Sequence, residues 1–290
     1  MKKMKTAIVA DSTSYLSKED LKKYNVHIIP ISVIFDGKDY REGIDITNDE
    51  FYKKLQESTK LPTTSQPPIG ALVEEYNKLA DEGYDAVISI HLASTISGMY
   101  QAVCNVSKMM DNIQIYPFNS GITVDPMAAL VKYAAKLAQE GVNPSEIIDK
   151  LKGLRSTIDE LIVVDDLDNL VKGGRLSNAS AFVGGLLNIK PILTFDNQTD
   201  EIVAFDKVRS KKKALKRVED LFSQAVEKAD YPIEVAVIDA NNPKEADIWQ
   251  KTIQDKYPNM KVSRGYFGPA IGTHLGSGAL ALGWIRDMSK

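Results

Sequence analysis

The sequence predicts an α/β protein of two domains, the first with a mainly parallel sheet and the second with a mixed sheet. In the first half, short apolar runs alternate with amphipathic stretches of helical length, which is typical of parallel strands joined by right-handed crossovers. In the second half, two β-branched runs flank the polar segment Asp196–Asp200 and predict an antiparallel hairpin. The 290 residues leave room for two medium domains. We place the boundary near Thr157, between residues 1–157 and 158–290.

The chain begins with a predicted buried strand over Thr6–Ala10, an apolar run that leads into the hydroxyl-rich turn Asp11–Ser14. Ser17, with an acidic residue three positions later, predicts the start of a short helix. The alternating run His27–Phe35 predicts a strand. Pro30 should make this strand irregular, because proline has no N–H to donate to a ladder.

Capping and stop signals delimit the remaining helices of the first half. Thr47 and Glu50 have the spacing of a capping box, which predicts a helix that ends near Ser58. Glycine after an amphipathic stretch and Asn-Pro before one mark further helix ends and starts. The other predicted elements are helices over Pro68–Asp81, Ser97–Met110, Asp125–Glu140 and from Pro144, and strands over Asp85–Ile90 and Ile113–Phe118.

The second half predicts a mixture of strands and helices after the glycine-rich stretch Lys172–Arg175. The predicted elements are the strand Leu161–Val164, the hairpin strands Lys190–Phe195 and Glu201–Asp206, the helix Lys211–Glu227, the strand Ile233–Asp239, the helix Pro243–Gln254, the strand Lys261–Phe267 and a final apolar helix after Gly278.

Composition narrows the class of protein. Thirty-six basic and 39 acidic residues give a net charge of −3, which does not support nucleic acid as a partner. Cys104 is the only cysteine, so no intramolecular disulfide can form, and this fits a reducing compartment. Neither a signal peptide nor an apolar run of about 18 residues is present, so we expect a cytoplasmic protein.

The segment Pro62–Pro67 is the most informative stretch of the chain. Two prolines flank three hydroxyl residues and Gln66, so we expect a rigid loop that presents neutral hydrogen-bond donors to a polar or anionic group. The alternative is an ordinary helix start, with Ser65 or Gln66 near the N-cap and Pro67 at the first helical position.

Two further segments place polar groups where strand-to-helix turns are expected. His91–Gly98 follows a predicted strand, and Gly272–Gly278 contains His274 between glycines. Ligands collect at the carboxyl ends of parallel strands, where helix amides are free to donate. We therefore expect the three segments to form one site, with His274 in a loop.

Catalytic and metal-binding alternatives have weaker support. Ser97 and His274 could serve a serine hydrolase or acyl transferase, but the chain has no G-x-S-x-G elbow. The turn after the first strand lacks the glycines of a phosphate-binding loop. The three histidines have no metal-ligand spacing, so we predict no metal.

Six segments occur in an order that resembles the DegV family, whose members bind fatty acids. They are DSTSYL, TTSQP, the Ser97–Gln101 turn, KGGRLS, LLNIKPIL and GTHLGSGALAL, and they cover essentially the whole chain. The resemblance implies two α/β domains with one acyl chain in a tunnel between them. It also implies a binding subunit that performs no chemistry itself, needs no cofactor, and presents the fatty acid to a bacterial fatty acid kinase for phosphorylation to acyl phosphate.

Matching the motifs residue by residue implies roles for individual side chains. The ligand carboxylate would contact Thr64, Ser97, Gly98 and His274, supported by the loop residues Thr63, Ser65, Gln66 and Thr273, and Arg175 would serve partner docking. Thr95 and Met99 depart from the family pattern beside this site, where glycine and threonine are usual, and Asn119–Thr123 fits its segment only loosely.

Two features leave alternatives open. Tunnel candidates are Ile31, Val33, Phe182 and Leu186–Leu187, although each also fits plain core. The basic run Lys207–Arg217 is either a solvated helix face or a docking patch for an acidic partner or a transiently contacted membrane surface.

Overall fold

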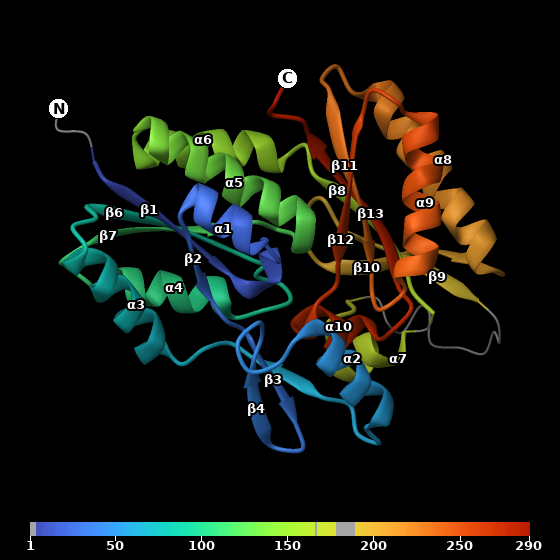
Figure 1. Cartoon of the computed structure of the whole chain (residues 1–290), viewed down its shortest axis with the longest axis horizontal. Helices are drawn as coiled ribbons and strands as arrows, with labels where there is room; N and C mark the ends of the chain where they lie inside the picture. The colour runs from blue at the N-terminus through green and yellow to red at the C-terminus, as the bar shows by residue number, and fades with distance from the viewer. Residues whose placement is uncertain (1–3, 166, 178–188) are drawn as a thin grey trace.

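Three sheets and the helices that cover them make up the computed structural model, which describes residues 4–165, 167–177 and 189–290 (Figure 1). The first sheet contains only parallel strands, in the order β2-β1-β6-β7. Its strands are β1 (Thr6–Asp11), β2 (Val26–Ile29), β6 (Ala86–His91) and β7 (Gln114–Asn119). The parallel pairing predicted from the alternating pattern is confirmed.

Helices cover both faces of this sheet, and α5 reaches the second sheet as well. One face carries α3 (Ile69–Asp81) and α4 (Met99–Ser107), and the other carries α1 (Lys18–Tyr24), α5 (Val124–Glu140) and α6 (Pro144–Arg155). Helix α5 packs on β1 and also on β11 and β13, so it lies between the two large sheets.

The second large sheet is mixed, as the sequence predicts, with the order β10-β9-β8-β13-β11-β12. Only β11 and β12 pair in parallel, and α8 (Lys211–Lys228) and α9 (Pro243–Lys256) cover one face. The strands are β8 (Asp159–Val163), β9 (Lys190–Phe195), β10 (Ile202–Val208), β11 (Ile233–Asp239), β12 (Lys261–Tyr266) and β13 (Leu280–Arg286).

The final element, β13, corrects the prediction of a C-terminal helix. It pairs with β8 on one side and β11 on the other, and every residue except Arg286 is buried. A central strand that is buried on both faces has no period-2 alternation, so its apolar run reads equally well as a buried helix.

A small third sheet was not predicted and corrects the reading of Pro62–Pro67 as a loop. Its strands β3 (Ser32–Phe35), β4 (Lys38–Arg41) and β5 (Thr63–Ser65) are antiparallel, and Thr64 pairs with Val33. The two prolines stand just outside the three-residue strand, so they bound the ladder without interrupting it. The N-cap alternative is also wrong, because α3 begins at Ile69 with Pro68 as its N-cap and no side-chain cap.

Local helix signals are confirmed where they rest on side-chain hydrogen bonds. Ser17 accepts from the amide of Asp20 at the start of α1, and Thr47 and Glu50 form a reciprocal capping box for α2 (Asn48–Glu57). Pro30 separates β2 from β3, which belong to different sheets. Two short helices, α7 (Asp168–Gly173) and α10 (Pro269–Leu275), pack against each other, and α10 also packs on α2 and β3, in the lower part of Figure 1.

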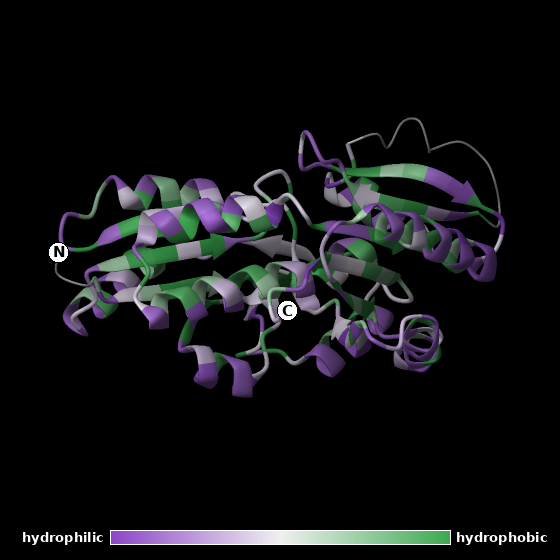
Figure 2. Cartoon of the chain, turned by 90° about the horizontal axis from the view of Figure 1, so that it is seen from above, coloured by the Kyte–Doolittle hydropathy of each residue, from purple (hydrophilic) through white to green (hydrophobic). Residues whose placement is uncertain are grey.

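A continuous apolar core joins the N-terminal and C-terminal elements. It includes Ile8 and Ile88 of the first sheet together with Ile162 and Ala281 of the second. In Figure 2 the strands are largely hydrophobic, whereas the helices turn hydrophilic faces outward. Among the helices of the described residues, none has the length and apolar character to cross a bilayer.

Candidate functional site

A cavity of about 280 Å³ lies where elements of both halves of the chain meet. Most of its wall is apolar, and its polar side chains are Thr64, Ser65, Gln66, Ser97, Thr123, Arg175 and His274. The apolar wall consists of Ile31, Leu92, Ile96, Ile162, Leu170, Phe195, Ile202, Phe267, Ala270, Ile271 and Leu275. A mainly apolar cavity with a few grouped polar atoms is the usual form of a small-molecule site.

Thr64 and His274 meet directly in this cavity, although 210 residues separate them in the chain. Thr64 Oγ1 lies 2.9 Å from His274 Nε2, within hydrogen-bonding distance. Strand β5 fixes Thr64 through its pairing with β3, and α10 carries His274 in its last turn. The sequence prediction that these two residues share a site is consistent with this geometry.

The structure corrects the prediction that His274 lies in a glycine loop. Gly272 is inside α10, where a Cβ would come within 2.6 Å of the Tyr52 hydroxyl, so the glycine serves close packing. Thr273 is likewise helical, and its buried hydroxyl donates to the carbonyl of Pro269 at 2.8 Å. Thr273 therefore stabilises the helix that carries His274 and does not line the cavity.

His274 is held as a neutral imidazole. Burial lowers its pKa from the usual 6.5 to about 4, and the nearby Arg175 guanidinium adds to this effect. Gly173 packs against the ring, because a Cβ at that position would lie 2.6 Å from His274 Nδ1. At neutral pH the side chain can therefore offer a hydrogen bond without carrying charge.

Ser97 and Gly98 form the cavity wall at the start of α4, with Gly98 as the N-cap. The hydroxyl of Ser97 accepts a hydrogen bond from the amide of Met99 at 3.2 Å. The side chain of Gln66 lies against Gly98, where a Cβ would come within 2.3 Å of Gln66 Oε1. Glycine at position 98 thus permits the two segments to meet, and the positive end of α4 faces the cavity.

Arg175 lines the same cavity, which the sequence did not indicate. Its Nε donates to the carbonyl of Ile96 at 3.3 Å, and its Nη1 donates to the carbonyl of Gly173. The half-buried guanidinium therefore bridges the end of α7 and the segment before α4. It places a positive charge in the wall that also holds His274.

The remaining predicted residues fall into three groups. Ser65 and Gln66 line the cavity, whereas Thr63 is exposed on the same strand and does not. Val33, Thr95 and Met99 are outside the lining, and Thr95 donates to the carbonyl of Asp200 on the β9–β10 turn. Phe182 and Leu186–Leu187 lie outside the described residues.

The pairing that a serine hydrolase would need is not formed between the two described side chains. His274 Nε2 faces Thr64, and the hydroxyl of Ser97 is bonded to its own helix start. In the parts of the chain that the structure describes, no group of three or more His, Cys, Asp or Glu residues is arranged to hold a metal ion.

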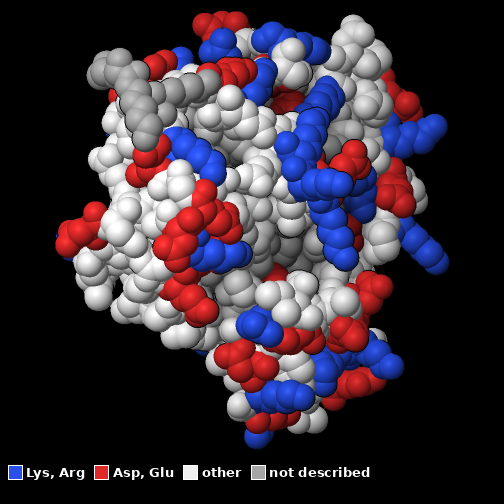
Figure 3. All heavy atoms as spheres, turned by 60° about the vertical axis from the view of Figure 1, so that its left-hand side comes forward, with Lys and Arg blue, Asp and Glu red and all other residues white. Residues whose placement is uncertain are grey.

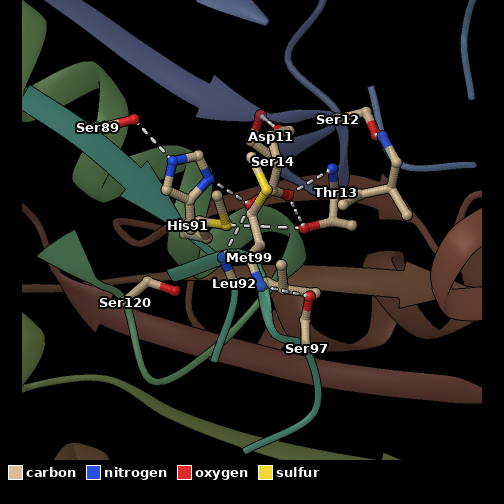
Figure 4. A network of polar contacts seen from close by, with 12 residues as sticks. Asp11, Ser12, Thr13, Ser14, Ser89, His91, Leu92, Ser97, Met99 and Ser120 are labelled. Atoms are coloured by element: carbon tan, nitrogen blue, oxygen red, sulfur yellow. Dashed lines mark hydrogen bonds and ion pairs between the residues drawn. The ribbon is translucent and has the colours of Figure 1, made fainter. Parts of the chain in front are cut away.

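A buried network behind the cavity anchors the start of the His91–Gly98 segment (Figure 4). Asp11 accepts from the amide of Leu92 at 2.9 Å and lies 3.1 Å from His91 Nδ1. On its other side His91 lies 2.7 Å from the hydroxyl of Ser89, which in turn contacts Tyr76. Asp11 belongs to the hydroxyl-rich turn, and it contacts both His91 and the amide of Leu92, which lines the cavity. The turn therefore has a structural role behind the site.

Glu42 links the N-terminal elements to the helix that carries His274. Its buried carboxylate accepts from the amide of Ala270 at 2.7 Å, from Tyr15 at 3.0 Å and from the hydroxyl of Ser12. Burial raises the pKa of Glu42 from 4.5 to about 7, although these hydrogen bonds partly offset the shift. Glu42 is therefore partly protonated near neutral pH.

We expect the substitution Glu42→Gln to change how stability depends on pH. Because the folded-state pKa is raised, this group's contribution to stability is present below about pH 4.5 and is lost as the pH rises to about 7. The stability of the native protein relative to Glu42→Gln should thus fall across this interval. Urea unfolding of both proteins at several pH values measures this difference, and a constant difference would contradict the assignment.

Charged side chains on the surface are mixed in sign. In Figure 3 basic side chains gather on one side of the face shown, with acidic side chains next to them. In the basic run, Lys211 pairs with Glu245, Lys216 with Asp220, and Arg217 with Asp206. These pairs favour the interpretation of Lys207–Arg217 as a solvated helix face.

Comparison with known proteins extends over the whole chain. The model of the family described as "Uncharacterised protein, DegV family" matches residues 5–287. Protein DegV of Bacillus subtilis is 44% identical over 282 residues, which cover 97% of this chain and 99% of that protein.

Solved structures show the same fold at comparable coverage. The crystal structure of DegV from Bacillus subtilis, described as a fatty acid binding protein, has a TM-score of 0.90 at 43% identity and covers 98% of this chain and 100% of its own. A fatty acid binding DegV family protein from Streptococcus agalactiae has a TM-score of 0.90 at 36% identity, with coverages of 98% and 99%.

Proposed function

The chain belongs to the DegV family, and we propose that it binds one long-chain fatty acid in the cavity and presents the carboxylate to a fatty acid kinase. In this proposal Thr64, Ser97, Gly98 and His274 hold the carboxylate, and the apolar wall holds the acyl chain. The protein acts as a carrier of the substrate, with the fatty acid as its ligand and no cofactor of its own.

The observation that carries the proposal is the pairing of Thr64 with His274 inside a largely apolar cavity. A carboxylate that leaves water needs hydrogen-bond donors for its oxygens. The hydroxyl of Ser97, the hydrogen-bonded Thr64–His274 pair and the amides that follow Met99 in α4 can supply such donors, and Arg175 supplies a compensating charge nearby. The fatty acid binding described for the Bacillus subtilis and Streptococcus agalactiae relatives supports the same ligand class.

The apolar wall explains why a strong charge cluster is unnecessary for affinity. Each methylene that leaves water contributes about 0.8 kcal/mol, so a tail of about 15 methylenes contributes on the order of 12 kcal/mol before association and ordering costs. The head group therefore sets orientation and selectivity more than total affinity.

Titration of delipidated protein with a fatty acid and with the alcohol of equal chain length measures how much the head group contributes to binding. The proposal requires saturable binding of the acid at one site per chain, and equal affinity for the alcohol would exclude the assigned head-group site.

Presentation to a kinase rests on the family resemblance and on the position of Arg175. We propose that Arg175 contributes to partner docking from the cavity wall, in a cytoplasmic protein that contacts membranes only transiently. In an assay with the kinase subunit and ATP, Arg175→Glu should lower acyl phosphate formation more strongly than Arg175→Lys. Retained lipid in both variants, measured by extraction, would separate docking from binding, and unchanged turnover in Arg175→Glu would exclude the docking role.

A further inference from the structure

The end of the β9–β10 hairpin forms part of the wall of the proposed fatty acid cavity. Phe195 at the end of β9 and Ile202 at the start of β10 both line the cavity, and each is 6% exposed. Among the described residues, the pairing of β9 with β8 ends at Leu193, so the hairpin continues past this pairing as two strands. Two strands alone have little stability, so this part of the wall depends on what it docks against.

Asp200, in the turn between β9 and β10, joins the hairpin to the N-terminal half of the chain. Its carboxylate accepts from the guanidinium of Arg155 in α6 and from the side-chain amide of Asn119 at 3.4 Å. Its carbonyl accepts from the hydroxyl of Thr95. We call these four residues the hairpin clasp. The side chains of Asp200 and Arg155 are 24% and 33% exposed, so water competes with the contact and the clasp can open and close again.

The N-terminal members of the hairpin clasp are held in place by their own half of the chain. Asn119 Oδ1 accepts from the amide of Ser94 at 3.1 Å, and Arg155 Nε donates to the carbonyl of Ser120 at 2.9 Å. Gly121 gives the guanidinium room, because a Cβ at this position would lie 2.2 Å from Arg155 Nη2. The N-terminal side of the clasp is therefore a fixed surface on which the hairpin docks.

A second cavity, of about 330 Å³, adjoins the first, and Phe195 lines both. Arg155 and Asp200 of the hairpin clasp line the second cavity, and its wall reaches solvent at the exposed residues Lys152 and Asn197. The buried ring of Phe195 therefore lies between the proposed fatty acid cavity and a space that opens to solvent.

We propose that the end of the β9–β10 hairpin is a gate through which the fatty acid enters and leaves, with Phe195 as the closing side chain and the hairpin clasp as the contact that keeps the gate shut. This inference rests on the proposed function, since it requires a fatty acid in the cavity. The four clasp residues lie outside the wall of that cavity, so the clasp does not favour the filled protein over the empty one. Weakening the clasp should therefore raise the rate constants of association and dissociation by the same factor and leave Kd unchanged.

Stopped-flow fluorescence with cis-parinaric acid, a fluorescent long-chain acid, measures both rate constants on delipidated protein. Association follows from the dependence on protein concentration, and dissociation from competition with an excess of a non-fluorescent acid. Asp200→Asn, which keeps the shape of the side chain but removes its charge, should raise both rate constants about fivefold, with Kd within about twofold of the wild-type value. Thr95→Val should also raise both, by a smaller factor, and tests the clasp from the N-terminal half.

Asp206→Asn provides the matched control. Asp206 lies on the same hairpin and pairs with Arg217 at 3.0 Å at comparable exposure, but both partners belong to the C-terminal half. This substitution removes an ion pair without weakening the hairpin clasp, so both rate constants should stay at their wild-type values.

The outcomes separate the gate from the fatty acid proposal. If neither Asp200→Asn nor Thr95→Val raises the association rate constant, or if Asp206→Asn raises it equally, the gate is wrong and fatty acid binding stands. If folded wild-type protein binds neither cis-parinaric acid nor any other long-chain acid, the proposed function itself fails.

Discussion

Replacing Ile202 with tryptophan should shorten the acyl chain that the protein can hold. Ile202 begins β10, is 6% exposed and lines the cavity, so a larger ring at this position fills space that the tail would occupy. Displacing about four methylenes would cost about 3 kcal/mol, or on the order of a hundredfold in Kd for a long-chain acid. Shorter acids that do not reach the ring should bind with little change.

Titration with saturated acids of increasing length, on delipidated wild-type and variant protein, measures this effect. The matched control is Phe205→Trp on the same strand, since Phe205 is 41% exposed and lies outside the cavity wall. Ile202→Phe should give a smaller shift in the same direction, and it keeps the test valid if the tryptophan variant is unstable. Equal loss of affinity for short and long acids would show that Ile202 does not border the tail.

Removing either partner of the Thr64–His274 pair should impair use of the carboxylate more than retention of the acyl chain. Each hydrogen bond to a charged group contributes about 1.5–3 kcal/mol, so Thr64→Val or His274→Ala should lower phosphoryl transfer by about 10- to 100-fold. The tail still supplies most of the binding free energy, so both variants should copurify with lipid.

The kinase-coupled assay and lipid extraction, performed on the same preparations, measure the two effects separately. Thr63→Val provides the control, because Thr63 lies next to Thr64 in β5 but is exposed and outside the cavity wall. Unchanged turnover in both cavity variants would contradict their assignment to the carboxylate. Loss of all lipid from both would show that the head group dominates affinity.

Features set by neighbouring residues could be predicted from the sequence. The capping box of α2, the cap at Ser17 and the parallel first sheet depend on local hydrogen bonds or on a regular alternation of strands and helices. The three-residue strand β5 is too short to show a period, and its pairing with β3 is a tertiary contact. The last strand lacks alternation because both of its faces are buried.

In the candidate site, too, the residue types could be predicted from the sequence, but the tertiary contacts could not. The hydroxyls and histidine could be identified by residue type, but the pairing of Thr64 with His274 depends on how β5 and α10 pack. Arg175 was predicted only as a docking residue and Glu42 was not singled out, because the groups that they contact come from distant segments.

Native mass spectrometry of the purified protein, followed by organic extraction, measures whether each chain carries a fatty acid. We expect one intact fatty acid per chain, which is lost on delipidation and restored by an added long-chain acid. Folded protein that repeatedly carries no lipid, and that takes up none when a long-chain acid is added, would contradict this expectation.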